Sequence, residues 1–397
     1  MKQDTKMNIL YIGCFRLPRY DAAAARVLNN ARAFKACGHD ITFISWGGRY
    51  DMQHLCSDGK YRIDGMEYII TGELDPKGSI VSKMIQLFHR GEKTLAILNS
   101  MQQKPDLIII YNADNSWTKT MIRFCSEHKI KLANDITEWY DSNDLHFWGI
   151  PSYNINMTKT QRLVKNKIVI SSYLNSYYRE SNNLQLPPLC DSQEEKWGAI
   201  VEDKRIVPFD GITLIYAGNP AKKDCVHTVI NAVNTLANEG QHIRFIIIGV
   251  TRESYFKNYQ HMLMTKNLHD NILFLGRVSQ DLIPAYYKKA DFMVLLREPS
   301  RKNMAGFPTK FAESMIAGIP VIANVTSDLG LYIRDGENGF VVSGYKYDDI
   351  IFTLRDKLSF LSAKNIAKMK ELTKSMNREF DYRTHKDAIE SFLGKIR

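Results

Sequence analysis

The chain has 397 residues, 44% of them hydrophobic and 24% charged, which is an ordinary balance for a folded globular protein. Its 53 Lys and Arg against 43 Asp and Glu give a formal net charge of +10. This composition excludes a disordered chain, and no apolar run approaches the ~20 residues that a membrane-spanning helix needs. At roughly 150 residues per domain, the length favours two domains.

The N-terminus and the cysteines indicate a reducing compartment. The first residues hold too few apolar side chains for a signal peptide. The six cysteines are scattered and include no Cys-x-x-Cys pair, so the sequence predicts neither a disulfide framework nor a zinc site. We therefore expect a cytoplasmic protein.

The first half of the chain alternates apolar runs with amphipathic stretches. Residues 8–13 are a first predicted strand, followed by a loop and by an Ala-rich helix over 22–37 that Gly38 ends. A second amphipathic helix is predicted over 116–128. Further predicted strands cover 41–46, 105–111, 131–136 and 167–171. Strands that alternate with helices predict a parallel sheet with crossover connections.

The pattern dissolves between residues 180 and 208 into polar residues and a Pro187-Pro188 pair, and then it restarts. A helix over 226–238 stands among predicted strands at 212–218, 243–249, 271–276, 290–296, 320–324 and 339–342. The predicted organisation is a first domain over 1–190, a linker over 191–210, a second domain over 211–375 and a C-terminal helix over 376–397. We expect an α/β protein whose two doubly wound, Rossmann-like domains face each other across a cleft.

Several common sites are absent from the sequence. No G-x-G-x-x-G follows the first strand, and neither G-x-x-x-x-G-K-[ST] nor H-E-x-x-H occurs. No two aspartates are separated by a single residue, so an Asp-x-Asp metal pair is missing as well. We therefore expect no resident metal and no cofactor.

The most informative segment is AGFPTKFAESMIAGIPVIAN, residues 305–324. It predicts a helix with Thr309 and Lys310 in its first turn and an end near Gly318. The free N–H groups of such a helix, with the charge of Lys310, suit a phosphate or diphosphate. Glu313 lies one turn further on, where it can accept hydrogen bonds from ribose hydroxyls. The alternative is an ordinary amphipathic helix with a solvated Glu313.

This segment resembles the retaining glycosyltransferases of family 4, which have the two-domain GT-B fold and carry a motif close to E-G-F-G-x-x-x-x-E-A-M-A-x-G-x-P-V-I. The first Glu of that motif is Ala305 here, and the second Gly is Pro308. The resemblance implies that Glu313 binds the nucleotide ribose and that Glu298 is a candidate to replace the missing Glu. The matching residues are Gly306, Phe307, Glu313, Met315, Gly318, Pro320 and Val321.

Two further segments extend the resemblance. YAGNPAKKD, residues 216–224, stands where family members bind the diphosphate through G-R-x-x-x-x-K-G. It keeps Gly218, has Asn219 in place of the Arg, and offers Lys223 as the diphosphate ligand, with Lys222 as a neighbour that can exchange roles. The alternative is a solvated loop. In FLGRV, residues 274–278, the resemblance implies that Arg277 and Val278 lie near the base.

The first domain offers weaker candidates. Gly13 follows the first strand, where the family places a loop near the diphosphate and the acceptor. The stretch over 133–141 resembles the position where related capsule-type enzymes carry an acidic pair near the acceptor hydroxyl. The resemblance makes Asp135 and Glu138 candidates to orient or deprotonate that hydroxyl, with helix capping by Asp135 as the alternative. Three arginines surround the first loop and either clamp a phosphate or form a basic face: Arg16, Arg19 and Arg26.

Together these features predict a retaining, metal-independent glycosyltransferase. It would move a sugar from a nucleoside diphosphate sugar to a hydroxyl of a growing glycan of the capsule, O-antigen or exopolysaccharide type. Lys223 and Lys310 would stabilise the leaving diphosphate. The alternatives are a non-catalytic subunit that binds nucleotide sugars and a sugar-nucleotide epimerase of the same fold; nucleic acid is not an expected partner.

A membrane surface is a further expected partner. The predicted helix over 116–131 pairs apolar side chains such as Trp117 and Met121 with Lys and Arg, and the run 159–167 adds more cations. We expect weak peripheral association with an anionic inner leaflet, where a lipid-linked acceptor would lie. The alternative is an ordinary core helix with a solvated basic face.

Overall fold

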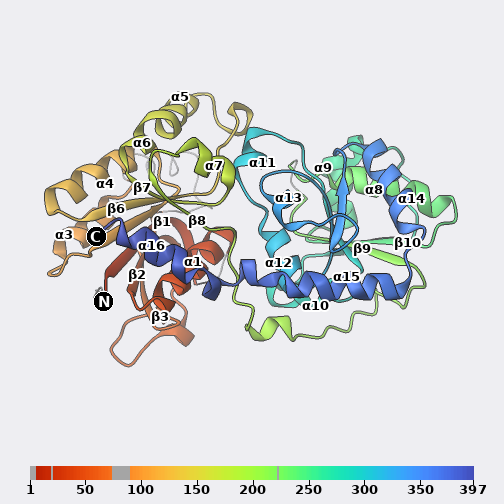
Figure 1. Ribbon diagram of the computed structural model, residues 1–397, viewed down its shortest axis with the longest axis horizontal. Coiled ribbons are helices and arrows are strands. Elements are labelled where there is room, and N and C mark those ends of the chain that lie inside the picture. Colours follow the sequence, from red (N-terminus) through yellow and green to blue (C-terminus); the bar gives the residue numbers. More distant parts are fainter. Residues whose placement is uncertain (1–5, 19–20, 74–89, 221–222) are drawn as a thin grey trace. The chain divides into compact units, whose positions relative to one another are not determined.

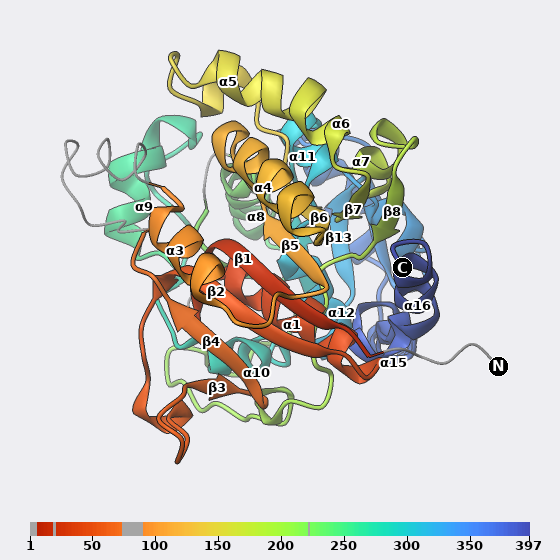
Figure 2. The same cartoon turned by 90° about the vertical axis from the view of Figure 1, so that its left-hand side faces the viewer.

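The computed structural model describes residues 6–18, 21–73, 90–220 and 223–397 (Figures 1 and 2). The chain divides into two compact units. Unit 1 comprises Met1–Leu189 together with Tyr382–Arg397, and unit 2 comprises Cys190–Asp381. Each unit is built around its own sheet.

The sheet of unit 1 has the strand order β3-β4-β2-β1-β5-β6-β7-β8. Only the short β3–β4 pair is antiparallel among its described neighbours. The first strand lies inside the sheet, and later strands extend to both sides, which is the doubly wound arrangement. The strands are β1 (Asn8–Leu17), β2 (Asp40–Gly48), β3 (Arg62–Ile63), β4 (Met66–Ile70), β5 (Leu107–Tyr111), β6 (Lys131–Ile136), β7 (Asn166–Val169) and β8 (Asn182–Gln185).

Two long helices of unit 1 begin at aspartate caps. The Asp21 side chain accepts from the Ala24 N–H at the start of α1, and Asp114 caps α4 in the same way through the Trp117 N–H. The described helices are α1 (Ala22–Ala36), α3 (Glu92–Ser100), α4 (Asn115–His128), α5 (Ile150–Ile155), α6 (Gln161–Leu163), α7 (Ser172–Tyr177) and α16 (Lys386–Gly394).

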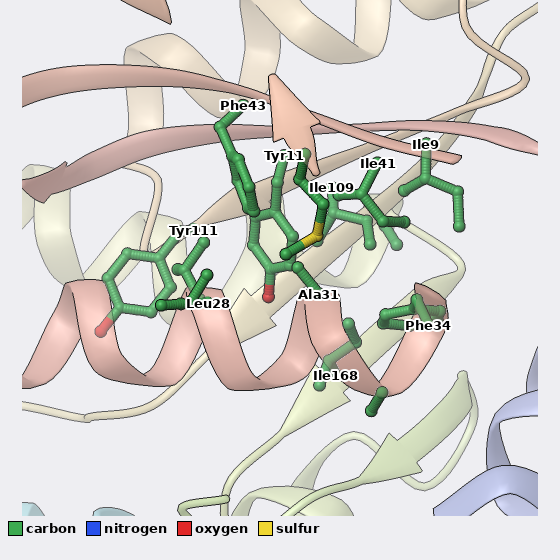
Figure 3. Close-up of a cluster of buried hydrophobic side chains, with 14 of the residues drawn as sticks. Ile9, Tyr11, Leu28, Ala31, Phe34, Ile41, Phe43, Ile109, Tyr111 and Ile168 are labelled. Carbon is green, nitrogen blue, oxygen red and sulfur yellow. The ribbon is translucent and has the colours of Figure 1, made fainter. Parts of the chain in front are cut away.

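Two hydrophobic clusters cover the two faces of this sheet, because successive side chains of a strand point to opposite faces. Ile9 and Tyr11 join the cluster that includes side chains of α1 and α16, and Figure 3 shows part of it above α1. Leu10 and Ile12 join the opposite cluster, which includes side chains of α3 and α4. The core of unit 1 is therefore a sheet between helical layers.

This packing corrects the expected membrane contact of the helix over 116–131. Trp117, Met121 and Phe124 are buried in the cluster beneath α4 and are at most 6% exposed. They cannot also enter a lipid surface. Among the described residues, no helix combines the length and apolar character needed to cross a membrane.

Unit 2 has an all-parallel sheet with the order β11-β10-β9-β12-β13-β14. Its strands are β9 (Ile212–Ala217), β10 (Ile243–Ile248), β11 (Ile272–Gly276), β12 (Phe292–Leu295), β13 (Val321–Asn324) and β14 (Gly339–Val342). Its described helices are α8 (Val226–Asn238), α9 (Arg252–Tyr259), α10 (Ile283–Tyr287), α11 (Arg301–Ala305), α12 (Thr309–Ala317), α13 (Leu329–Tyr332), α14 (Tyr347–Leu358) and α15 (Ala363–Ser375). The strand order reverses between β9 and β12, which makes this pair the topological switch point.

Three segments differ from the expected organisation. Strand β1 continues past Gly13 to Leu17 through an irregular register, where a loop was expected. The segment 191–210, expected as a linker, groups with unit 2, where Asp203 accepts a hydrogen bond from Tyr286 at 2.8 Å. The C-terminal helix begins at Lys386, after two short helical turns, and groups with unit 1.

Candidate functional site

The switch point of unit 2 carries a cluster of charged side chains. In open parallel sheets, ligands lie outside the carboxyl ends of the strands at the switch point. Arg297 follows β12 and Asp224 follows the loop after β9, and an isolated bridge joins their backbones. An Asp–Arg pair therefore lies at the switch point of the unit 2 sheet, which is where parallel sheets usually bind ligands.

Asp224 accepts hydrogen bonds from three elements. Its Oδ1 accepts from Arg297 Nε at 2.8 Å, and its Oδ2 accepts from Lys310 Nζ at 2.8 Å and from the Tyr216 hydroxyl at 2.7 Å. The Asp224 side chain is only 1% exposed. Two cations face this single carboxylate, so the cluster (Tyr216, Asp224, Arg297 and Lys310) carries a net positive charge.

The protonation states of this cluster follow from its surroundings. Burial alone would raise the pKa of Asp224, but Lys310 and Arg297 outweigh it and hold that pKa well below its usual range. Burial, with the Asp224 charge, raises the pKa of Tyr216, which stays a neutral hydroxyl donor. Asp224 is therefore ionised at physiological pH, and the excess positive charge persists.

Lys310 is held in the first turn of α12 by the backbone around it. Gly218, just after β9, has φ 139°, and a Cβ there would lie 2.3 Å from Lys310 Cε. A side chain at this position would displace the end of the lysine stem, and the backbone conformation is one that residues other than glycine rarely adopt. The Lys310 side chain is 17% exposed, in contrast to the buried Arg297 and Asp224. The described part of the cluster thus offers Lys310 as its most accessible cation, next to the N–H groups that begin α12.

Glu313 lies one turn along α12 from Lys310 and is half-buried. Burial raises its pKa, while the nearby charges of Lys196 and Lys310 lower it. A carboxyl in such a place has lost much of its hydration, and hydroxyl donors would restore hydrogen bonds to it. Its position suits a ligand that brings a diol.

The prediction of α12 itself is confirmed, with Thr309 and Lys310 in its first turn and Gly318 as a left-handed C-cap. Gly306, Phe307 and Pro308 are buried before it, and Thr309 is half-buried. The Phe307 ring packs against Phe311, Tyr332 and Phe380 with ring centroids 5.8–6.1 Å apart. Phe307 therefore fixes the start of α12 within the core.

The remaining predicted donor residues lie at or near strand ends of unit 2. Asn219 is exposed, and its carbonyl accepts from the Tyr216 hydroxyl at 3.0 Å. Lys223 is half-buried beside Asp224, whereas Lys222 lies outside the described residues. Arg277 is exposed and Val278 half-buried after β11, and Glu298 is exposed after β12. Their roles stay predictions.

The roles predicted for two residues of unit 1, Asp135 and Arg26, are wrong. Asp135 is fully buried within β6, and its partner Arg26 is 4% exposed. Arg26 donates to the Asp135 carboxylate at 2.8 Å, and the Tyr11 hydroxyl and the Asn30 amide donate to the same group. Asp135 therefore neither reaches an acceptor nor caps a helix, and Arg26 does not clamp a phosphate. Both charges are satisfied inside the core.

The other candidates of unit 1 have local contacts of their own. A Cβ at Gly13 would lie 2.8 Å from the Tyr111 carbonyl oxygen, so the glycine permits close strand packing. Arg16 Nε pairs at 2.6 Å with Asp21, the N-cap of α1. Glu138 is half-buried just after β6, and Arg19 lies outside the described residues. No role in catalysis follows from these contacts.

Sequence reasoning missed Arg297 and Asp224. Each is a charged residue in the segment that follows an apolar strand, and these two strands, β9 and β12, flank the reversal of strand order in unit 2. A charged residue in the segment after an apolar strand was the sequence signal that could have indicated these two site residues.

The architecture of the two units is that of a known fold class. Two doubly wound parallel units in one chain are the architecture of the GT-B glycosyltransferases. Residues 202–372 match the family model described as Glycosyl transferases group 1. Unit 2 of this chain therefore carries a glycosyl transferases group 1 domain.

Solved structures share the whole fold at low sequence identity. Sucrose-phosphate synthase from Thermosynechococcus elongatus is 14% identical with a TM-score of 0.73, and the superposition covers 98% of this chain and 99% of that one. Anabaena HepE in complex with UDP and glucose is 14% identical with a TM-score of 0.65, covering 98% and 100%. At this identity the likeness concerns the fold.

A curated relative matches a shorter region. It is the GDP-mannose-dependent alpha-(1-6)-phosphatidylinositol monomannoside mannosyltransferase of Mycobacterium tuberculosis, 24% identical over 128 residues. The match covers 31% of this chain and 32% of that protein. The chain thus aligns with about a third of the length of this relative.

Proposed function

We propose that the chain is a retaining glycosyltransferase that moves a sugar from a nucleoside diphosphate sugar to a hydroxyl of a growing surface glycan. The observation that carries the proposal is the positive cluster at the switch point of unit 2, next to the start of α12. A diphosphate is the ligand whose charge and size suit a lysine beside free helical N–H groups. The group 1 family match of the same unit supports this choice.

Stabilisation of the leaving group would carry the chemistry. As the bond between the anomeric carbon and the diphosphate oxygen breaks, negative charge grows on that oxygen. Lys310 and the first N–H groups of α12 would meet this charge, and Asp224 would hold Lys310 in place before the reaction starts. Lys223, beside Asp224, is a second cation for the same diphosphate, with Lys222 as its neighbour in the chain.

Retention and independence of metal are parts of the proposal. In a front-face reaction the acceptor oxygen bonds to the anomeric carbon on the side from which the diphosphate leaves, and the departing phosphate takes the acceptor proton. Arg297 and Lys310 supply positive charge of the kind that a bound cation supplies in other transferases. We therefore expect EDTA to leave turnover unchanged.

The nucleotide would extend from the diphosphate along α12. Glu313 would accept hydrogen bonds from the ribose hydroxyls, and these bonds would offset the burial that raises its pKa. Backbone near Gly306 and Phe307 would face the donor sugar, with Glu298 as the candidate in place of a glutamate at Ala305. UDP is bound in one structural neighbour and GDP-mannose is the donor named for one relative, so the proposal leaves the base open.

The test begins with a panel of UDP-, GDP-, ADP- and dTDP-sugars in a thermal-shift screen, because a ligand of the native state raises the melting temperature. The stabilising donor is then incubated with glycan acceptors, and the anomeric configuration of the product is read by NMR. Transfer with retention supports the proposal. Isomerised donor without acceptor would instead favour an epimerase, and binding without turnover would favour a non-catalytic subunit.

A further inference from the structure

Unit 1 contains a polar pocket between the end of α7, the start of β8 and the end of α16. Its volume is about 380 Å³, and pockets for small molecules commonly have about 300–1,000 Å³. In this region α16 packs beside β8 (Figure 2). The residues that line the pocket are all polar and belong to unit 1, and they include Asn175, Arg179, Ser181, Asn182, Asn183 and Lys395.

Asparagine side chains hold the walls of this pocket together. Asn183 Nδ2 donates to the carbonyls of Asn175 and Tyr178 at 3.3 and 2.9 Å, and to the Asn175 side-chain oxygen at 3.1 Å. Asn182 Nδ2 donates to the Phe392 carbonyl of α16 at 3.1 Å. These hydrogen bonds connect α7, β8 and α16, so the pocket is formed by elements that fix one another.

The acceptor atoms of two of these asparagines have no partner. The Oδ1 atoms of Asn182 and Asn183 are buried and accept no hydrogen bond within the part of the chain that the structure describes. Buried polar atoms are nearly always hydrogen-bonded, so two unpaired acceptors at one pocket need an explanation. A ligand that brings hydroxyl donors to these asparagines would supply the missing bonds.

The charge at the pocket is positive. Arg179 and Lys395 are exposed, and neither forms an ion pair among the described residues. None of the described residues that line the pocket is acidic. Glu180 is the next residue in the chain after Arg179, and it pairs with Arg162 at 3.9 Å. The lining cations are therefore available to an anion.

A buried cation contacts the pocket lining through Ser181. Lys167 of β7 is fully buried, and its Nζ donates to the Ser181 hydroxyl at 2.8 Å and to the Val164 carbonyl. Burial, with the charges of Arg162 and Lys165, lowers the pKa of Lys167 to about 7. An anion on the pocket side of Ser181 would offset part of the cost of this buried charge.

We propose that this pocket binds a small sugar phosphate. The phosphate would accept hydrogen bonds from Arg179 and Lys395, because guanidinium and ammonium groups both bind phosphate oxygens. The ring hydroxyls would donate to the amide oxygens of the lining asparagines. The volume of the pocket suits one sugar ring with its phosphate.

This pocket is separate from the proposed donor site. It lies at the amino end of β8, whereas parallel sheets hold their substrates outside the carboxyl ends of the strands. It also lies wholly within unit 1, whereas Lys310 and Asp224 belong to unit 2. The proposal therefore does not depend on the transferase activity and is tested without a donor.

The direct test is isothermal titration calorimetry with glucose 6-phosphate, with ethyl phosphate and with glucose. Glucose 6-phosphate should bind at least about tenfold more tightly than ethyl phosphate, which lacks the ring hydroxyls, and glucose should not bind measurably. Lys310→Gln should bind glucose 6-phosphate like the wild type, because Lys310 belongs to the donor site of unit 2. Hydrogen exchange should show protection by glucose 6-phosphate over residues 175–183 and at the end of α16.

A double substitution tests the two cations. R179Q/K395Q should weaken the binding of glucose 6-phosphate at least about tenfold. The matched control K119Q/R123Q removes an exposed lysine and an exposed arginine of α4 in the same unit, and it should bind like the wild type. Circular dichroism of each variant excludes misfolding as the cause of a loss.

Four results would overturn the proposal. The first is the absence of glucose 6-phosphate binding, and the second is equal binding by R179Q/K395Q and the wild type. The third is binding of ethyl phosphate or glucose as tight as that of glucose 6-phosphate. The fourth is a loss of binding in Lys310→Gln, which would place the ligand in unit 2.

Discussion

Asp135 in unit 1 and Asp224 in unit 2 are both buried carboxylates that accept hydrogen bonds from a tyrosine and an arginine. The tyrosine comes in each case from the first strand of the sheet, Tyr11 in β1 and Tyr216 in β9. The clusters differ in charge. Asp135 meets one cation, whereas Asp224 meets Arg297 and also Lys310.

The difference in exposure follows the difference in charge. Arg26 and Asp135 have side chains 3% and 0% exposed, so their balanced pair is closed to ligands. In the cluster of unit 2, Lys310 is 17% exposed and leaves an excess positive charge that an anion can reach. A buried aspartate that is balanced by one cation, such as Asp135, therefore stabilises the core. A buried aspartate that contacts a second, accessible cation, such as Asp224, holds that cation in place for a ligand.

The largest expected effect comes from a substitution that breaks the balanced pair of Arg26 and Asp135. Asp135→Asn leaves the Arg26 guanidinium buried without its counter-charge, so the free energy of unfolding should fall by about 3–5 kcal/mol. Urea denaturation measures it. The control is Asp40→Asn, which removes an exposed pair with Lys6 and should change stability little. If both variants were equally mild, the account of Asp135 as a structural residue would be wrong.

Lys310→Gln should remove the accessible cation and leave the Arg297–Asp224 pair. Turnover of the donor found in the screen should fall about 10²–10³-fold, because the charge developing on the leaving group loses its partner. Stability should change much less than in Asp135→Asn. The control is Lys357→Gln, a lysine of α14 whose side chain is 41% exposed. An equal loss in the two lysine variants would contradict the assignment.

Lys167 of unit 1 is a buried cation that has no carboxylate among its hydrogen-bond acceptors. Its Nζ donates to the Ser181 hydroxyl and the Val164 carbonyl, and burial, with Arg162 and Lys165, lowers its pKa to about 7. The unfolded chain binds a proton at this lysine up to about pH 10.5, so stability should rise by about 2 kcal/mol between pH 7 and pH 9. Lys167→Met should remove this rise. Identical pH profiles in urea titrations would refute the shifted pKa.

Glu313→Gln should give the smallest effect. We expect about tenfold weaker binding of the donor nucleotide, with the loss confined to contacts with the ribose. The wild type should prefer a ribonucleotide over its 2′-deoxy analogue in calorimetry, and the variant should not. Glu371→Gln, an exposed residue of α15, is the matched control. A preference that survives in Glu313→Gln would remove the residue from the ribose site.

Long apolar strands and amphipathic helices were predictable from the sequence, because apolar runs and hydrophobic periodicity are local features. The helix over 226–238 and the strand at 107–111 are examples. Strand β8 was not predicted, since its sequence NNLQ buries only Leu184 and its position depends on pairing with β7. The short β3 and β4 similarly owe their place to neighbouring strands.

The candidate site was predictable where one helix carries it, as at Thr309, Lys310 and Glu313. It was not predictable where it depends on residues far apart in the chain. The contact between Asp224 and Arg297 joins positions 73 residues apart. The difference in net charge between the Asp135 and Asp224 clusters appears only when the cations of other elements are in place.

The most direct test of the central claim is a crystal structure with the nucleoside diphosphate that stabilises the protein most in the screen. The account predicts the diphosphate at the start of α12, with a phosphate oxygen within about 3 Å of Lys310 Nζ while Asp224 still holds Arg297. A diphosphate bound elsewhere, with Lys310 contacting only Asp224, would contradict it.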